Sequence, residues 1–163
     1  KLTKIQTQYI SININLVKIF LFLLFLQLII GAFVSGMDAG KVYNTWPLMG
    51  TSYFPDDSQY IEFLNVKVFD NPSIVQFIHR NLAYLIIGVY FYILFFTFKN
   101  ENKIFRMPVI IMGASLFLQV IFGIFTILSG VKILYASLHQ INSIFIILST
   151  LYFLYIIKYR KFN

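Results

Sequence analysis

The stretch Leu16-Val-Lys-Ile-Phe20-Leu-Phe-Leu-Leu-Phe25-Leu-Gln27-Leu-Ile-Ile-Gly31-Ala-Phe-Val-Ser35 decides the class of this protein. A helix needs about 20 consecutive, mostly apolar residues to cross the hydrocarbon core of a bilayer. This stretch has that length, and Lys18 is its one charged residue. It therefore predicts a transmembrane helix.

Three further apolar stretches of similar length follow, over residues 72–98, 108–129 and 132–157. Asn71-Pro72 is a start signal for the second, because Asn is a good N-cap and Pro is tolerated at the first helical position. We expect one domain over residues 1–163. Its fold class is all-α, an integral membrane four-helix bundle with one long outer loop, residues 36–71, partly ordered and lying over the outer end of the bundle.

The composition agrees with a membrane protein and argues against a nucleic-acid binder. Hydrophobic residues make up 59% of the chain and charged residues 12%, about half the usual share of charge in a soluble domain. The net charge is +7, but the basic residues are dispersed rather than arranged as a phosphate-binding stripe. The chain has no cysteine, which excludes disulfides, thiolate metal sites and covalent c-type heme attachment.

The distribution of Lys and Arg predicts the orientation in the membrane. The long loop holds two lysines and five acidic residues, whereas the opposite side is basic, as cytoplasmic loops usually are. Both termini are therefore expected on the cytoplasmic or matrix side. The basic residues on that side are Lys1, Lys4, Lys18, Lys99, Lys103, Arg106, Lys158, Arg160 and Lys161.

The four stretches also read as two copies of one helical hairpin. Gln27 precedes Gly31 by four residues in the first stretch, and Gln119 precedes Gly123 by four in the third. The second and fourth stretches each carry one histidine. This pattern suggests an internal repeat of Q-x-x-x-G followed by a histidine.

The two histidines, His79 and His139, are the main candidates for chemistry. Each lies seven residues after the expected start of its helix, roughly 10 Å inside the outer end at 1.5 Å per residue. Ionisable residues inside the membrane are usually functional, and two imidazoles at one depth suit axial ligation of a single heme iron. The alternatives are two unrelated structural histidines, or a zinc or copper site, for which two ligands are too few.

Small residues lie near the expected depth of the histidines. Ala83 and Ser143 follow the histidines by four residues, on the same helix face, and Gly31 and Gly123 occupy the other two helices. Together they would leave a slot that a porphyrin fills. The alternative is that small residues allow close packing between helices.

Arg80 and a pair of loop carboxylates allow two interpretations each. Arg80, next to His79, either pairs with a heme propionate, which its planar fork of donors suits, or extends to the outer interface. Asp56 and Asp57 follow Pro55 in the loop. A solvated turn is the favoured interpretation there, ahead of an acid/base pair.

The loop motif carries a family resemblance. The segment Gly31-Ala-Phe-Val-Ser-Gly36-Met-Asp-Ala-Gly40-Lys-Val-Tyr-Asn44-Thr-Trp-Pro47-Leu-Met-Gly50 resembles the start of the C-terminal half of heme A synthases of the mitochondrial and alphaproteobacterial type. Three later segments resemble that family in the same order, and together the four cover nearly the whole chain. They are Val75-Gln-Phe-Ile-His79-Arg80, Leu118-Gln-Val-Ile-Phe-Gly-Ile-Phe-Thr126 and Leu138-His139-Gln140.

The resemblance implies a function. Heme A synthases oxidise a methyl group of heme O to the formyl group of heme A, a step of heme biosynthesis that serves cytochrome c oxidase assembly. The C-terminal half holds heme b through histidines that correspond to His79 and His139. The reacting heme lies in an N-terminal half, which residues 1–163 do not include, so that half is the expected partner. The expected location is the mitochondrial inner membrane or the bacterial cytoplasmic membrane.

Two other functions stay open on the sequence. The first is a single-heme membrane cytochrome b subunit that transfers electrons without catalysis of its own. The second is a heme-free assembly subunit, in which the matched histidines are coincidental. The expected partners are membrane lipid, heme O and the N-terminal half, with no nucleic acid; the sequence leaves a homo-oligomer open.

Overall fold

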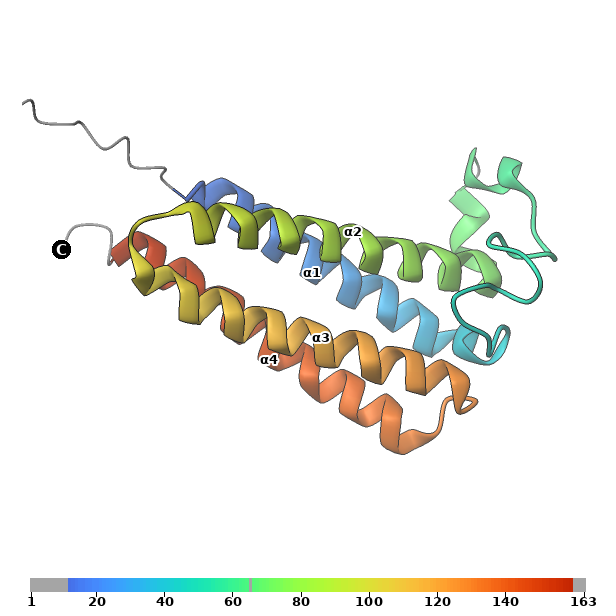
Figure 1. The fold of residues 1–163 in the computed structure, drawn as a ribbon. Coiled ribbons are helices and arrows are strands. Elements are labelled where there is room, and N and C mark those ends of the chain that lie inside the picture. The colour runs from blue at the N-terminus through green and yellow to red at the C-terminus, as the bar shows by residue number, and fades with distance from the viewer. Residues whose placement is uncertain (1–11, 65, 160–163) are drawn as a thin grey trace, which may run out of the picture.

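Four long helices carry the fold in the computed structural model, which describes residues 12–64 and 66–159 (Figure 1). Each is long and apolar enough to cross a membrane, so the chain is an all-α integral membrane protein, as predicted. The helices are α1 (Ile14–Gly36), α2 (Pro72–Lys99), α3 (Arg106–Leu128) and α4 (Ile133–Tyr159).

The helix ends lie close to the expected ones. The side chain of Asn71 accepts hydrogen bonds from the backbone N–H groups of Ser73 and Ile74, which confirms the expected start of α2. Helix α3 begins at Arg106, two residues before the expected Pro108. A proline is tolerated there because the first N–H groups of a helix have no intrahelical partner.

The helices pack as two hairpins, α1 with α2 and α3 with α4. The hairpins approach each other at the end that carries the described chain ends and diverge toward the outer loop (Figure 1). The main apolar core lies at the converging end and includes Phe20, Ile93, Met112 and Phe153, each at most 1% exposed. The outer half of the bundle buries polar side chains as well as apolar ones, among them Gln76 and Arg80.

The outer loop folds over the diverging end of the bundle. It contains three short 3-10 helices: η1 (Ala39–Lys41), η2 (Tyr60–Leu64) and η3 (Val66–Asp70). Ala39 and Met49 are buried. The side chain of Asn44 donates to the carbonyls of Gly40 at 2.8 Å and Ile127 at 3.0 Å, which ties the loop to α3. The loop thus lies over this end of the bundle, as expected from the sequence.

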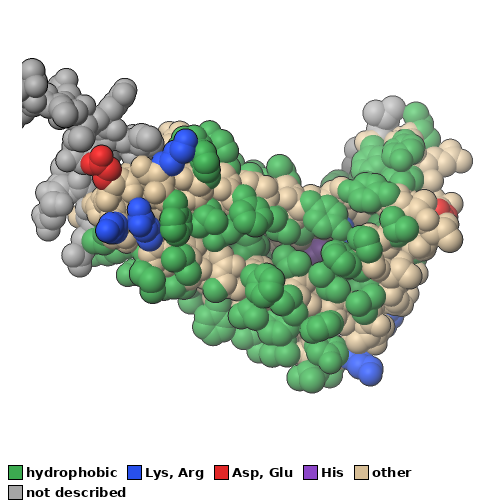
Figure 2. Space-filling model, in the orientation of Figure 1, with side chains coloured by type: hydrophobic (Ala, Val, Ile, Leu, Met, Phe, Trp, Pro, Cys, Tyr) green, Lys and Arg blue, Asp and Glu red, His purple; other side chains and the backbone are tan. Residues whose placement is uncertain are grey.

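The surface matches a lipid environment. Hydrophobic side chains cover most of the face shown in Figure 2, and Lys and Arg side chains gather at its ends. Histidine atoms are visible on this face between hydrophobic side chains (Figure 2). The histidine region is thus reached from the side of the bundle as well as from its interior.

Candidate heme site

The first histidine, His79, contacts Gln27 across the α1–α2 hairpin. The Gln27 Nε2 atom lies 3.2 Å from His79 Nε2 and donates to the His79 backbone carbonyl at 3.0 Å. An amide nitrogen only donates, so His79 Nε2 accepts and the ring proton is on Nδ1. His79 Nδ1 and Gln27 Oε1 are buried without a hydrogen-bond partner among the described residues.

The second histidine, His139, is held by more contacts across the α3–α4 hairpin. Its Nδ1 lies 3.0 Å from the Gln119 carbonyl, which can only accept, so Nδ1 carries the proton. Its Nε2 lies 3.4 Å from Gln119 Nε2. The Asn142 side chain donates to Gln119 Oε1 and to the Ser115 carbonyl, both at 2.8 Å. His139 is therefore oriented by a connected polar network.

The repeated glycines lie directly against the imidazoles. A Cβ atom added to Gly31 would be 3.2 Å from His79 Cε1, and one added to Gly123 would be 3.0 Å from His139 Cε1. The glycines thus make room for the imidazoles of the neighbouring helix, which the sequence pattern did not reveal. Of the other small residues, Ser143 donates its hydroxyl to the Gln140 carbonyl and Ala83 is half-buried.

The two imidazoles, one from each hairpin, are neighbours whose ring planes meet at 70°. Their ring centroids are 6.5 Å apart. A metal bound by two imidazole nitrogens at about 2.0–2.1 Å each has ring centroids on the order of 6 Å apart. Each Nε2 is unprotonated, as a metal ligand must be, and a metal bound there would take the place of the Gln amide that now faces it. The residues present therefore fit a bis-histidine heme.

A bare metal ion fits less well. Within residues 12–64 and 66–159, no three His, Cys, Asp or Glu side chains form a group that could hold a metal. Structural zinc takes four ligands and catalytic zinc three protein ligands. A porphyrin supplies four nitrogen ligands itself, so two histidines suffice.

Arg80 holds the outer loop beside His79. It is 7% exposed, and it donates to the carbonyls of Leu48 at 3.2 Å and Tyr43 at 3.0 Å. The side chain of Gln76, one turn earlier on α2, also donates to the Tyr43 carbonyl at 3.0 Å. The loop contact is a role that neither sequence-based interpretation of Arg80 included. The Nε of Arg80 has no partner among the described residues.

The loop contact predicts the effect of removing the guanidinium. In an Arg80→Met variant, we expect the backbone amides of residues 43–50 to exchange with solvent at least tenfold faster, because hydrogen bonds to charged groups contribute about 1.5–3 kcal/mol. Hydrogen exchange measured by mass spectrometry in detergent tests this. Lys41→Gln is the control, since the ion pair of Lys41 with Asp38, at 2.8 Å, is exposed. Unchanged hydrogen exchange in Arg80→Met would contradict a stabilising contact between Arg80 and the loop.

The loop carboxylates stabilise a turn. Asp56 accepts hydrogen bonds from hydroxyl groups, first that of Ser52, and these lower its pKa. Burial raises the pKa of Asp57, but hydrogen bonds to its carboxylate, including one of 2.7 Å from Ser73, outweigh burial and lower the pKa overall. Both groups are ionised at neutral pH. This favours the turn over a pair that shares a proton.

Comparison with known proteins identifies the family. Residues 8–151 match the model of the COX15-CtaA family, described as "Cytochrome oxidase assembly protein". The chain belongs to this family. Among its relatives are proteins named "Heme A synthase", and the resemblance seen in the sequence is confirmed at the level of the family.

Two relatives of this COX15-CtaA member are about twice its length or more. The Heme A synthase of Pelagibacter ubique is 42% identical over 145 residues, which cover 88% of this chain and 42% of that protein. The one from Wolbachia pipientis wMel is 41% identical over 138 residues, covering 85% and 38%. The chain thus spans about two fifths of these relatives. No solved structure matches it.

Sequence reasoning on this COX15-CtaA member missed the role of the amides. The repeat contained Gln27 and Gln119, but the sequence assigned them no function. Asn142 was not noted at all. Its signal was weak, because an Asn three residues after His139 is one polar residue in a long apolar helix. The spacing Q-x-x-x-G was the better signal, since it recurs opposite each histidine.

Proposed function

We propose that this chain is the heme b-binding half of a heme A synthase, with His79 and His139 as the axial ligands of the iron. The observation that carries the proposal is the pair of imidazoles whose ring centroids lie 6.5 Å apart, one from each copy of the hairpin repeat. The names of the relatives support it at the level of the family. The match of the loop motif to the C-terminal half of heme A synthases supports the choice of half.

The chain's own residues prepare the imidazoles for this role. Gln27 and Gln119 each direct an amide nitrogen at an Nε2 atom, which keeps that nitrogen unprotonated. The contact of His139 Nδ1 with the Gln119 carbonyl is the kind that fixes the tautomer and ring direction of metal-binding histidines, and iron would replace the amide at each Nε2. When bound, a heme with two imidazole ligands is low-spin and six-coordinate, suited to electron transfer and closed to O₂.

The two histidines contribute unequally in this proposal. His139 Nδ1 already donates to the Gln119 carbonyl, and Asn142 holds the Gln119 side chain. His79 Nδ1 has no partner among the described residues. Rotating His79 therefore breaks fewer contacts than rotating His139. We infer that His139 is the pre-oriented ligand and that His79 adjusts to complete the site.

The remaining pocket residues have supporting roles. Arg80 uses two of its five N–H donors on loop carbonyls, so donors remain for a heme propionate near His79. Ala83 and Ser143, one turn further along from the histidines, leave space on the faces of α2 and α4. Gly31 and Gly123 allow the imidazoles to approach α1 and α3.

The complete activity needs more than these residues. We propose that the chain works with an N-terminal half, in the same or a separate chain, that binds heme O and oxidises its methyl group to the formyl group of heme A. Both termini of this half lie on the cytoplasmic or matrix side. The support for that orientation is the basic end of the bundle, where Lys99, Lys103 and Arg106 lie.

Heme content and product formation test the proposal. The full chain, expressed in membranes and purified, is expected to carry about one b-type heme with a low-spin spectrum. Co-expression with a candidate N-terminal half, followed by heme extraction, is expected to yield heme A from heme O only when both are present. Heme without heme A formation would favour a single-heme electron-transfer subunit. Absence of heme from an intact, folded chain would contradict the proposal.

A further inference from the structure

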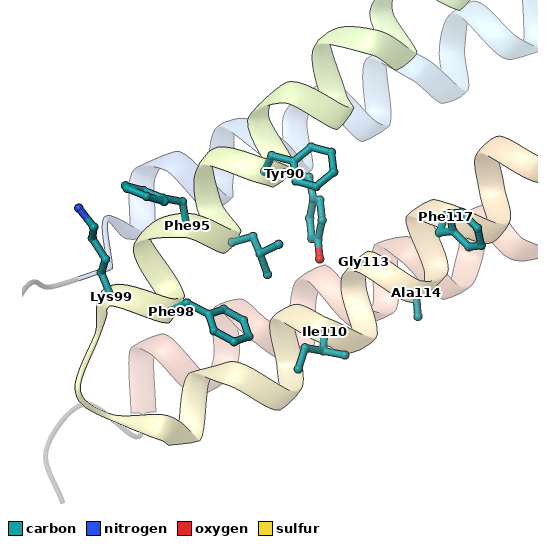
Figure 3. A pocket seen from close by; sticks show the side chains of 10 residues that line it. Tyr90, Phe95, Phe98, Lys99, Ile110, Gly113, Ala114 and Phe117 are labelled. Carbon is teal, nitrogen blue, oxygen red and sulfur yellow. The ribbon is translucent and has the colours of Figure 1, made fainter.

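An apolar groove runs between α2 and α3 in the half of the bundle away from the outer loop (Figure 3). Its volume is about 880 Å³, in the range of sites that hold small molecules. It begins eleven residues past His79 on α2 and does not include either histidine. Aromatic rings dominate its lining, which includes Tyr90, Phe95, Phe98 and Phe117.

Tyr90 closes the deep end of the groove. Its hydroxyl reaches across from α2 and donates to the Val109 carbonyl at 3.3 Å. A Cβ atom added to Gly113 would lie 1.9 Å from that hydroxyl oxygen, so the ring rests directly on the α3 backbone. Figure 3 shows the ring directed at Gly113. The groove therefore has a defined floor and opens sideways, toward lipid.

Lys99 lines the opposite end of the groove, and Arg106 lies next to it, against the lining residue Phe98. The Lys99 ammonium is 4.3 Å from the centroid of the Phe95 ring, and the Arg106 guanidinium is 5.3 Å from that of Phe98. The Arg106 Nε is buried without a hydrogen-bond partner among the described residues. Glu101, the acidic residue in the loop between α2 and α3, is exposed. This end of the groove is therefore positively charged, and the Nε–H donor of Arg106 is unused among the described residues.

The length of the groove matches one leaflet of a membrane. Tyr90 and Lys99 are nine residues apart on α2, or about 14 Å at 1.5 Å per residue. Half of the hydrocarbon core is about 15 Å thick. The aromatic lining thus covers the depth of one acyl chain, and the cations lie at the level of the headgroups.

We propose that this groove binds an anionic phospholipid, with one acyl chain along the aromatic lining and its phosphate between Lys99 and Arg106. Basic pockets between transmembrane helices on the cytoplasmic or matrix side suit such headgroups. A transmembrane helix of a partner protein would place apolar side chains beside Lys99 and Arg106 and leave both positive charges unneutralised. Charge complementarity therefore favours the lipid.

Lipid titration of the purified full chain in mild detergent, followed by native mass spectrometry, tests the proposal. The probes are phosphatidylglycerol and phosphatidylcholine with identical acyl chains. We expect phosphatidylglycerol to bind at least tenfold more tightly. The double variant Lys99→Gln/Arg106→Gln is expected to lose that preference, with roughly tenfold weaker binding of phosphatidylglycerol. Lys132→Gln, which removes an exposed cation at the other end of the bundle, is the matched control.

A second variant tests the acyl chain separately from the charge. Ala114→Phe fills the groove from the α3 side and keeps both cations. It is expected to weaken phosphatidylglycerol binding at least fivefold, whereas glycerol phosphate, which lacks acyl chains, should bind neither protein measurably. Equal binding of the two phospholipids would overturn the proposal. So would an equal loss of phosphatidylglycerol binding in the Lys132→Gln control, or a bound polypeptide that Ala114→Phe displaces. Unchanged elution in size-exclusion chromatography checks that the variants are folded.

Discussion

A His139→Ala variant is expected to lose its heme almost completely, whereas His79→Ala is expected to keep a five-coordinate, high-spin heme. The reason is the different support of the two imidazoles. The Gln119 carbonyl and the Asn142 network hold His139 in the orientation that iron requires. His79 makes its ring contact to a single amide, from Gln27. The loss of a pre-oriented ligand should therefore cost more affinity than the loss of an adjustable one.

The measurement is the absorption spectrum and heme content of each purified variant. We expect wild type to be low-spin at near-full occupancy, His79→Ala high-spin at half occupancy or more, and His139→Ala below a tenth. Gln140→Ala, an exposed change next to His139, is the control and should match wild type. Equal losses of heme in both histidine variants would refute the unequal roles of His79 and His139 but not their ligation of the iron. Full low-spin heme in either one would refute bis-histidine ligation itself.

A Gly123→Ala variant is expected to bind heme at least tenfold more weakly while its helices become no less stable. The added Cβ atom would lie 3.0 Å from Cε1 and 3.3 Å from Nδ1 of His139, so the imidazole must shift slightly from the position in which Nδ1 contacts the Gln119 carbonyl. Within a helix, alanine is otherwise favoured over glycine by about 1 kcal/mol. Affinity and helix stability should therefore change in opposite directions.

Gly88→Ala is the matched control for this prediction. It is also a glycine within a membrane-spanning helix, but an added Cβ atom meets nothing within 4 Å. We expect wild-type heme affinity in Gly88→Ala, and an intermediate loss in Gly31→Ala, where the contact with His79 Cε1 is 3.2 Å. Heme titration and thermal unfolding in detergent provide both quantities. Weaker binding in Gly88→Ala to the same degree would show that the loss is not specific to the imidazole contact.

The sequence predicted the spans and one start signal well, because each depends on local properties. Apolar length decides whether a helix can cross a bilayer, and it located all four. The Asn71 cap is a contact between neighbours in the chain, so its residues could be read directly. The start of α3 was misplaced by two residues because proline is tolerated anywhere in a first helical turn.

The roles of Arg80 and the glycines could not be predicted in this way. The partners of Arg80 lie 32 and 37 residues away in the loop, at Leu48 and Tyr43. A guanidinium inside a membrane span needs some partner, but its sequence position does not say which. Gly31 and Gly123 were recognised as small, yet a small residue serves equally for close helix packing or for space beside a side chain.

The sequence by itself determined that this chain has four segments able to cross a membrane, because apolar length is a property of each segment alone. The equal depth of His79 and His139 stays a prediction from helical rise. Only the tertiary structure decided that the imidazole centroids lie 6.5 Å apart and that a glutamine amide contacts each ring. Those facts depend on the rotation of each helix about its axis and on the divergence of the two hairpins. Packing between distant segments sets both, and no local pattern encodes them.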